Sequence, residues 1–156
     1  MKITNSEHVN IDGRTGTGKT FLARQYLAGF ESVFVLDTKG MFAWPEIPGT
    51  IWSEHYLVDG NKELEIVNSV NDLANAQTAK VIYRPSYDEL NFDYYDEFFK
   101  FCYFRGNTTV LVDEAFSICP TPYKIPDFYR AILTRGRELK VSCWSLTQRP
   151  SGIPQI

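Results

Sequence analysis

The chain alternates between short, continuously apolar runs and longer segments with helical spacing. The apolar runs are Val33–Leu36, Lys80–Tyr83, Thr108–Val112 and Val141–Leu146. Such runs are typical of strands that are buried on both faces of a parallel sheet. A more polar strand is predicted at His8–Asp12, before the other four.

Segments with helical spacing separate these strands. Lys19–Phe30 predicts a helix that ends near Gly29, and three more helices are predicted at Glu63–Ala76, Phe92–Phe104 and Asp127–Leu139. Strands that alternate with helices pair in parallel through right-handed crossovers. The pattern therefore predicts an α/β sandwich.

Two connecting segments do not fit this alternation. Met41–Gly60 predicts an excursion with a short strand at Thr50–Trp52, and Cys119–Pro126 predicts a loop stiffened by prolines. Loops of this kind often carry function, but a connecting role is the simpler expectation for each.

Length and composition narrow the class of protein. With 156 residues, 44% hydrophobic and 22% charged, the chain predicts one globular domain over residues 1–156. No apolar run approaches the ~18 residues of a membrane span, and the first residues lack the apolar part of a secretion signal. The chain has only three cysteines, and they are scattered: Cys102, Cys119 and Cys143. We therefore expect no disulfide framework, and we expect the protein in a reducing cytoplasm.

Charge is distributed unevenly along the chain. Residues 1–119 carry ten lysines and arginines against seventeen acidic residues, whereas residues 120–156 carry six against two. A basic end on an acidic body would suit phosphates, on a nucleotide or a nucleic acid. It would also suit a solvated surface, so charge alone leaves both interpretations open.

The strongest chemical signal follows the first predicted strand and precedes the first predicted helix. It matches the pattern G-x-x-x-x-G-K-[ST] at every fixed position, with the residues Gly13, Arg14, Thr15, Gly16, Thr17, Gly18, Lys19 and Thr20. Glycines let backbone N–H groups curl around a phosphate, and the helix N-terminus adds partial positive charge. Lys19 would then reach the β- and γ-phosphates of ATP, and the Thr20 hydroxyl would take one position on Mg²⁺. The alternative is a chance glycine turn before a helix.

A second anchor for Mg²⁺ is predicted where the run Thr109–Val112 ends. Asp113 follows it directly, at the edge where open α/β sheets bind ligands, and would hold the metal through water. Glu114 would polarise the attacking water as general base. Asp37, which ends Val33–Leu36, is a weaker rival for the metal and is expected only to line the site.

The last predicted strand also ends in polar residues, within Leu146–Pro150. Gln148 would lie at the same edge of the sheet and hydrogen-bond the γ-phosphate or the attacking water. The alternative is an ordinary polar strand end before a proline.

Two arginines close the preceding helix, in Thr134–Arg137. The helix dipole alone favours cations at this end. The sharper hypothesis is that Arg137, or Arg135 as second choice, is an arginine finger that enters the site of the next subunit.

The aromatic segment Phe92–Phe104 is expected to form core or subunit-interface packing, because its rings cover most of the helix among acidic residues. His8 and His55 have no metal-ligand partners at suitable spacing, and the cysteines form no C-x-x-C pair. We expect no zinc.

Taken in order, four segments resemble the FtsK–HerA superfamily of ring-forming P-loop ATPases: Gly13–Thr20, Val110–Glu114, Thr134–Arg137 and Thr147–Pro150. The resemblance covers nearly the whole chain, although Met41–Gln77 matches only loosely. In its short length the chain is most similar to the ATPase domain of viral genome-packaging motors, especially those of small tailed phages.

The resemblance implies a three-layer P-loop sandwich of the ASCE type, in which Gly13–Thr20 is the Walker A motif and Thr109–Glu114 the Walker B motif. It also implies an extra strand, here Lys80–Tyr83, between the strands that carry these two motifs. It also implies a homo-oligomeric ring in an infected host's cytoplasm that moves double-stranded DNA, with a phage portal or procapsid as partner. Arg137, or else Arg135, would be the finger acting between subunits.

The same resemblance assigns roles at the site. Lys19 and Thr20 would bind nucleotide and metal, Asp113 and Glu114 would serve metal and water, and Gln148 would sense the γ-phosphate.

Relatives in this superfamily continue beyond the last strand, whereas the sequence ends at Ile156. We therefore keep the expectation that it is the N-terminal part of a longer protein. Two other classes stay open: a P-loop kinase acting on a small molecule, and a membrane-associated phage-assembly ATPase. Glu114 and Gln148 favour water as the acceptor over a kinase substrate, and an assembly ATPase would need a membrane segment.

Overall fold

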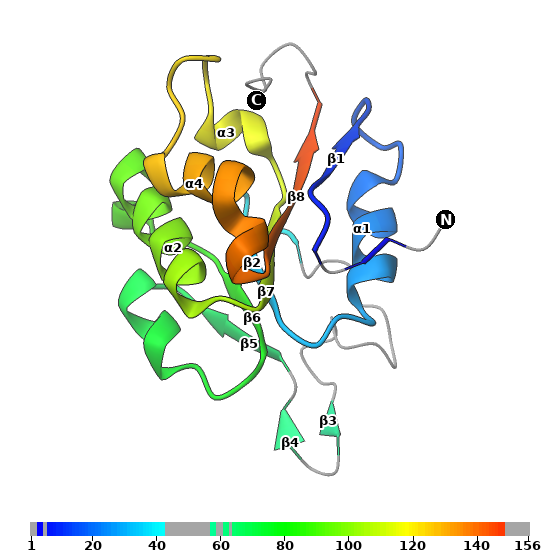
Figure 1. Cartoon of the computed structure of the whole chain (residues 1–156), viewed down its shortest axis with the longest axis vertical. Coiled ribbons are helices and arrows are strands. Elements are labelled where there is room, and N and C mark those ends of the chain that lie inside the picture. Colours follow the sequence, from blue (N-terminus) through cyan, green and yellow to red (C-terminus); the bar gives the residue numbers. More distant parts are fainter. Residues whose placement is uncertain (1–2, 5, 43–56, 59–60, 63, 149–156) are drawn as a thin grey trace.

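A computed structural model describes residues 3–4, 6–42, 57–58, 61–62 and 64–148 of the chain (Figure 1). Its centre is a sheet of six parallel strands in the order β1-β8-β7-β2-β6-β5. These strands are β1 Val9–Asp12, β2 Val33–Leu36, β5 Leu64–Val67, β6 Lys80–Tyr83, β7 Thr108–Val112 and β8 Val141–Thr147.

Helices cover both faces of this sheet (Figure 1). The α-helices are α1 Lys19–Leu27, α2 Phe92–Arg105, α3 Ala115–Ile118 and α4 Asp127–Arg135. Short 3₁₀ helices are η1 Val70–Asn75, η2 Tyr87–Glu89 and η3 Gly136–Leu139. A separate antiparallel pair is formed by β3 Leu57–Val58 and β4 Asn61–Lys62. The expected three-layer, mainly parallel sandwich is confirmed.

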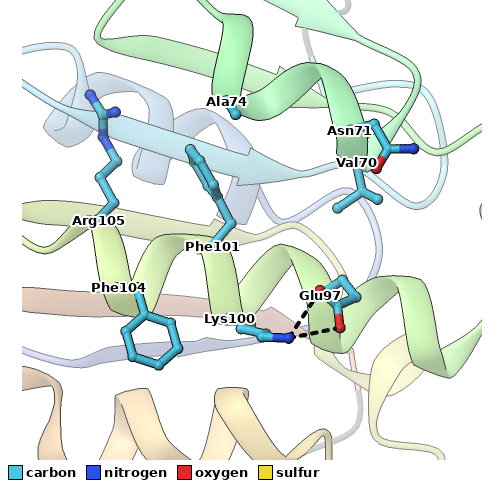
Figure 2. Close-up of a pocket in the computed structure, with 8 residues that line it drawn as sticks. All are labelled: Val70, Asn71, Ala74, Glu97, Lys100, Phe101, Phe104 and Arg105. Carbon is cyan, nitrogen blue, oxygen red and sulfur yellow. Dashed lines mark hydrogen bonds and ion pairs between the residues drawn. The ribbon is translucent and has the colours of Figure 1, made fainter.

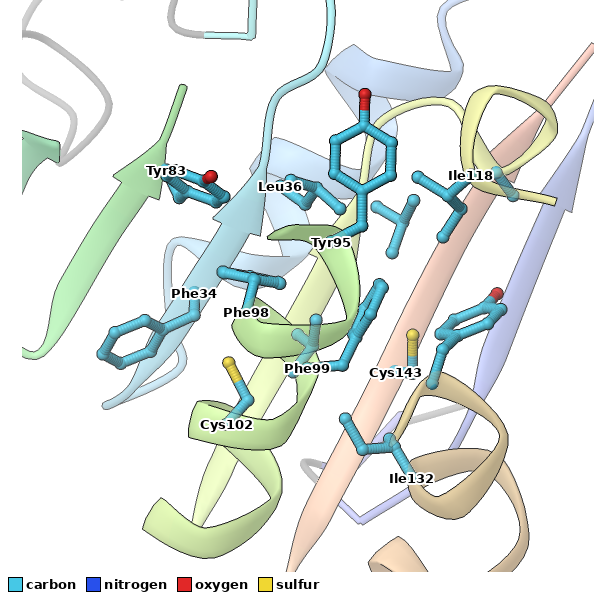
Figure 3. Close-up of a cluster of buried hydrophobic side chains, with 14 of the residues drawn as sticks. Phe34, Leu36, Tyr83, Tyr95, Phe98, Phe99, Cys102, Ile118, Ile132 and Cys143 are labelled. Atoms are coloured by element: carbon cyan, nitrogen blue, oxygen red, sulfur yellow. The ribbon is translucent and has the colours of Figure 1, made fainter. Parts of the chain in front are cut away.

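The larger core lies between the sheet and α2, α4 and η1 (Figure 3). Helix α2 buries one stripe at helical spacing, consisting of Tyr95, Phe98, Phe99 and Cys102. Its first turn is capped by Asn91, whose side chain accepts hydrogen bonds from the backbone N–H groups of Asp93 and Tyr94. The aromatic segment thus packs mainly as core, with Phe104 exposed at the end of the helix.

The smaller core lies on the opposite face of the sheet, under α1. Ala23 and Leu27 pack there against alternate side chains of the strands, among them Leu111 and Trp144. Because consecutive strand residues point to opposite faces, each continuously apolar run serves both cores. The strand prediction for these runs is confirmed by β2, β6, β7 and β8.

The helix predicted over Glu63–Ala76 is wrong. Leu64–Val67 forms strand β5, which pairs with β6, and Val70–Asn75 forms only a 3₁₀ helix. The β-branched Ile66 and Val67 favour the strand. Ser69 then accepts a hydrogen bond from the backbone N–H of Asn71, which favours a turn over a continuing helix.

The placement of Lys80–Tyr83 between the Walker A and Walker B strands is also wrong. β6 pairs with β2, on the side of β2 away from β7. The strand between β1 and β7 is β8, which pairs with both. An apolar run shows that a strand is buried but does not specify its neighbours, so sequence spacing left the order open.

Some expectations fall outside the described residues. The short strand at Thr50–Trp52 is one, and the Arg149-Pro150 part of the last motif is another. In the described part of the chain, no helix combines the length and the apolar character that crossing a membrane requires.

Candidate functional site

The turn between β1 and α1 has a backbone shape that depends on its glycines. Gly16 and Gly18 have φ angles of 80° and 84°, in the left-handed region that other residues rarely adopt. A Cβ on Gly13 would come within 2.8 Å of the Thr17 hydroxyl. That hydroxyl donates to the carbonyl oxygen of Arg14 at 2.8 Å and closes the turn.

Helix α1 starts directly after this turn and has no side-chain cap. Gly18 is its N-cap residue, and glycine has no side chain with which to accept from the first N–H groups. These donors and the positive end of the helix dipole therefore face the turn, where they can bind an anion.

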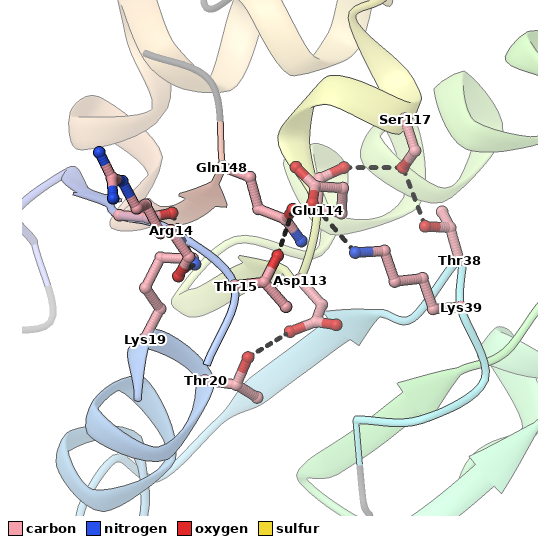
Figure 4. Close-up of polar contacts among 11 residues, drawn as sticks. Arg14, Thr15, Lys19, Thr20, Thr38, Lys39, Asp113, Glu114, Ser117 and Gln148 are labelled. Carbon is pink, nitrogen blue, oxygen red and sulfur yellow. Dashed lines mark hydrogen bonds and ion pairs between the residues drawn. The ribbon is translucent and has the colours of Figure 1, made fainter. Parts of the chain in front are cut away.

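Lys19 bends back over the turn. Its Nζ donates to the carbonyl oxygens of Gly13 and Arg14 at 2.8 and 2.9 Å (Figure 4). These acceptors are neutral, so the ammonium has no carboxylate partner among the described residues. It is held at the anion-binding turn and can exchange carbonyls for phosphate oxygens.

Thr20 and Asp113 connect the turn to the end of β7. The Thr20 hydroxyl donates to Asp113 Oδ1 at 3.0 Å (Figure 4). Burial raises the pKa of the Asp113 carboxyl above its usual value; the Thr20 hydrogen bond and the charge of Lys39 lower it, and the charges of Asp37 and Glu114 raise it further. A divalent cation bound by these two oxygen groups would stabilise the charged carboxylate, and oxygen ligands are those Mg²⁺ prefers.

Glu114 is buried beside this pair and faces a lysine that the sequence analysis missed. Lys39 Nζ lies 3.0 Å from Glu114 Oε2. Ser117 donates to the Glu114 carbonyl oxygen at 2.7 Å and also shares a hydrogen bond with Thr38 (Figure 4). Glu114 Oε1 is buried and has no hydrogen-bond partner among the described residues, which therefore leave it unsatisfied as an acceptor.

Lys39 lies three residues beyond the end of β2, at the same edge of the sheet as Asp113. Its position after a buried parallel strand could have identified it as a site residue, because the ends of such strands line ligand sites. From the sequence, we expected only Asp37 of this segment to line the site.

Asp37 does not line the site as expected. Its carboxylate is fully buried, accepts from the backbone N–H groups of Met41 and Phe42, and pairs with Arg84 Nε at 3.2 Å. Through these contacts the carboxylate holds the segment that follows β2 in place, so the carboxylate is not free to bind a metal.

Gln148 is brought to the glycine-rich turn by the pairing of β1 with β8. Asp12 lies opposite Thr147 in register, and the Gly13 N–H donates to the Thr147 carbonyl oxygen at 3.2 Å. Gln148 Oε1 then accepts from the Thr15 hydroxyl at 2.7 Å. The expected position of Gln148 at this edge is therefore found.

One cavity of about 320 Å³ collects these side chains (Figure 4). It is lined by Thr15, Gly16, Gly18, Lys19, Thr20, Phe21, Lys39, Asp113, Glu114 and Gln148. Three sequence motifs, together with Lys39, thus converge on one space.

Arg135 and Arg137 are not part of this cavity. Arg135 ends α4 and Arg137 lies in η3, and both are exposed. η3 leads into the start of β8, whereas the residues that line the cavity follow the carboxyl ends of the strands. Gly136 between them is required by packing, because a Cβ there would overlap the Val141 carbonyl oxygen. Arg137 lines a different cavity beside His8, whose pKa burial and this arginine lower.

A larger cavity, of about 610 Å³, lies between η1 and α2 (Figure 2). Its lining is mostly apolar, with Phe101 and Phe104 prominent, and Lys100 there is paired with Glu97 at 3.2 Å. It has no glycine-rich turn and no strand-end carboxylate. Size alone therefore does not identify the chemical site, and we place it at the smaller, polar cavity.

No protein-family model and no curated protein sequence matches the chain. Among solved structures, it is similar to the genome packaging NTPase B204 from Sulfolobus turreted icosahedral virus 2. The complex of that protein with AMPPCP aligns with a TM-score of 0.67 and 17% identity over 97% of this chain and 70% of that chain. The complex with ATP-gammaS gives a TM-score of 0.68, again at 17% identity.

B204 from Sulfolobus turreted icosahedral virus, described as a DNA-packaging ATPase, is also similar. It aligns with a TM-score of 0.66 and 16% identity over 98% of this chain and 70% of that chain. At this identity the likeness concerns the fold. It confirms the P-loop NTPase fold implied by the sequence resemblance, in the form found in a genome-packaging enzyme.

Proposed function

We propose that the protein is an Mg²⁺-dependent ATPase that drives packaging of double-stranded DNA into a viral capsid. The observation that carries the ATPase proposal is the convergence of Lys19, Asp113, Glu114 and Gln148 on the cavity beside the glycine-rich turn. The fold shared with nucleotide-bound structures of a packaging NTPase supports the same proposal.

In this proposal the turn and the first N–H groups of α1 hold the phosphates. Lys19 leaves the carbonyl oxygens of Gly13 and Arg14 for the β- and γ-phosphates. Thr20 and Asp113 hold Mg²⁺, which when bound offsets the charge of the phosphate oxygens.

Glu114 is the proposed general base. One oxygen of its buried carboxylate pairs with Lys39, and the other has no hydrogen-bond partner in the described part of the chain. Once water reaches this second oxygen, it takes the proton of the attacking water. Gln148, held by Thr15, orients that water or contacts the γ-phosphate. Lys39 would exchange Glu114 for a γ-phosphate oxygen as the nucleotide enters.

Water is favoured over a small-molecule acceptor by Glu114 and Gln148. A kinase needs a pocket for its acceptor, whereas these two side chains line the same cavity as Lys19 and Asp113. Within the described residues, these polar groups suit a water molecule.

The DNA-packaging part of the proposal rests on the resemblance and on the fold. A homo-oligomeric ring around DNA, with a portal or procapsid as partner, is what the superfamily resemblance implies. The basic C-terminal part of the chain agrees with a phosphate-bearing partner.

The test is the rate of ATP hydrolysis with and without double-stranded DNA, with the mass of the assembly measured in the same buffer. We expect Mg²⁺-dependent hydrolysis that DNA stimulates in an assembled form. Hydrolysis without any response to DNA would leave an ATPase and remove the packaging role. Phosphate transfer to an added small molecule in place of water would support a kinase.

A further inference from the structure

One lining residue of the nucleotide cavity has no place in the proposed chemistry. Phe21 follows Thr20 on the first turn of α1 and lines the cavity, yet 59% of it is exposed. Every other residue that lines the cavity is polar, charged or glycine. An aromatic ring at the mouth of a polar site is therefore a feature to be explained.

Packing within the subunit does not explain it. α1 presents Ala23 and Leu27 to the sheet, and at 3.6 residues per turn Phe21 lies roughly 200° around the helix from Ala23. Phe21 belongs to neither core cluster. Among the described residues, no aromatic ring or cation packs against it.

The side chains that line the cavity differ in chemistry. Asp113, Glu114, Lys39 and Gln148 follow the ends of strands and suit the terminal phosphate, the metal and water. A nucleotide also has a flat, largely apolar end, its base. Phe21 is the lining side chain with a matching apolar face.

We infer that Phe21 stacks on the nucleobase and so makes the site select nucleotides over inorganic polyphosphate. This inference rests on the proposed nucleotide site. An aromatic ring recognises the face of a base and not its hydrogen-bonding edge. Phe21 therefore adds affinity for ATP without itself separating ATP from GTP.

The experiment compares two ligands that share the phosphate chain. Binding of ATP and of inorganic tripolyphosphate, each with Mg²⁺, is measured by calorimetry for the wild type and for Phe21→Ala, Phe21→Tyr and Leu22→Ala. We expect Phe21→Ala to weaken ATP binding about 5- to 150-fold and to leave tripolyphosphate binding unchanged. Phe21→Tyr keeps the ring and should bind ATP as the wild type does. Leu22→Ala, which removes a neighbouring exposed apolar side chain outside the cavity, should change neither affinity.

Other results would overturn the inference. An equal loss for both ligands would mean that Phe21 supports the turn, and no loss for either would mean that it contacts something else. A loss of assembly mass with both affinities intact would make it a subunit contact. If the wild type binds neither ligand, the proposed function itself fails, and this outcome is distinct from a wild type that binds both.

A second variant keeps the test decisive if Phe21→Ala does not fold. Phe21→Trp places an indole at the same position. The tryptophan fluorescence that this variant has beyond that of the wild-type protein should be quenched by ATP and not by tripolyphosphate. Quenching by neither ligand, or by both equally, would contradict stacking on a base.

Discussion

Glu114 and Lys39 form an ion pair at the cavity, with 3.0 Å between Oε2 and Nζ. This pair holds the Glu114 carboxylate against the ammonium. A γ-phosphate brings more negative charge than one carboxylate and would compete for Lys39. Loading of ATP would then release Glu114 for its role as base.

Lys39→Ala tests this exchange. We expect the variant to bind ATP about tenfold more weakly and to bind ADP nearly as the wild type does, since only the third phosphate reaches the Glu114 end of the cavity. Titration of both nucleotides with Mg²⁺ measures the difference. Lys100→Ala is the matched control, because Lys100 forms a similar ion pair with Glu97 outside the site. Equal weakening of ATP and ADP would show that Lys39 does not contact the terminal phosphate.

At the scale of elements, the site depends on which strand ends lie side by side. The register of β1 with β8 places Gln148 beside Thr15, and that of β7 with β2 places Asp113 beside the segment carrying Lys39. Parallel strands end at a common edge, and for this reason three motifs far apart in the sequence meet.

Much of this arrangement could be predicted from the sequence, and the exceptions have physical causes. The glycine-rich turn was located by its sequence motif, and Asp113, Glu114 and Gln148 were located because each follows a buried strand. Glu63–Ala76 was assigned to a helix because Leu64–Val67 is a half-exposed edge strand, without the continuously buried pattern of the other strands. The order of strands was missed because it depends on three-dimensional packing that one apolar run does not encode.

Glu89 links three elements beside the larger core. Its buried carboxylate accepts from the Tyr83 hydroxyl at 2.6 Å, the Ser69 hydroxyl at 2.7 Å and the Val70 N–H at 2.9 Å. Burial alone would raise its pKa, but these three hydrogen bonds lower it below the usual 4.5. The ionised form is therefore the one that stabilises β6, η1 and η2 together.

Glu89→Gln should lower the free energy of unfolding by about 1–3 kcal/mol at pH 7, because an amide cannot accept all three hydrogen bonds. A depressed carboxyl pKa stabilises the fold above the unfolded pKa and loses this effect as pH falls through the folded one. The gap between variant and wild type should therefore narrow below about pH 4.5, as denaturant titrations at several pH values would show. Glu97→Gln, at an exposed site, serves as control, and a gap independent of pH would contradict the account.

At the scale of the whole molecule, the cavity and the two arginines lie at opposite ends of the parallel strands. Arg137 is therefore placed away from the site of its own subunit. In a ring, one edge of a subunit can approach a neighbour, which is the geometry that a finger acting between subunits needs.

Arg137→Ala should lower the hydrolysis rate about 10³- to 10⁵-fold in assembled rings and leave the nucleotide affinity of a single subunit nearly unchanged. Mixing two kinds of variant subunit shows whether the arginine acts on a neighbouring subunit or on its own. Inactive Glu114→Gln subunits still carry Arg137 and should restore turnover to Arg137→Ala subunits. Assembled rings that show no rescue would count against Arg137, and Arg135→Ala would then be mixed in the same way.

The most direct test of the ATPase claim is Glu114→Gln, measured for both binding and turnover. The amide cannot take the proton from water, but it keeps the size of the side chain and leaves the glycine-rich turn, Thr20 and Asp113 in place. We predict that ATP affinity stays within a few-fold of the wild type while hydrolysis falls about 10²- to 10⁴-fold. Hydrolysis at the wild-type rate by a folded Glu114→Gln protein would contradict the assignment of Glu114 as the base.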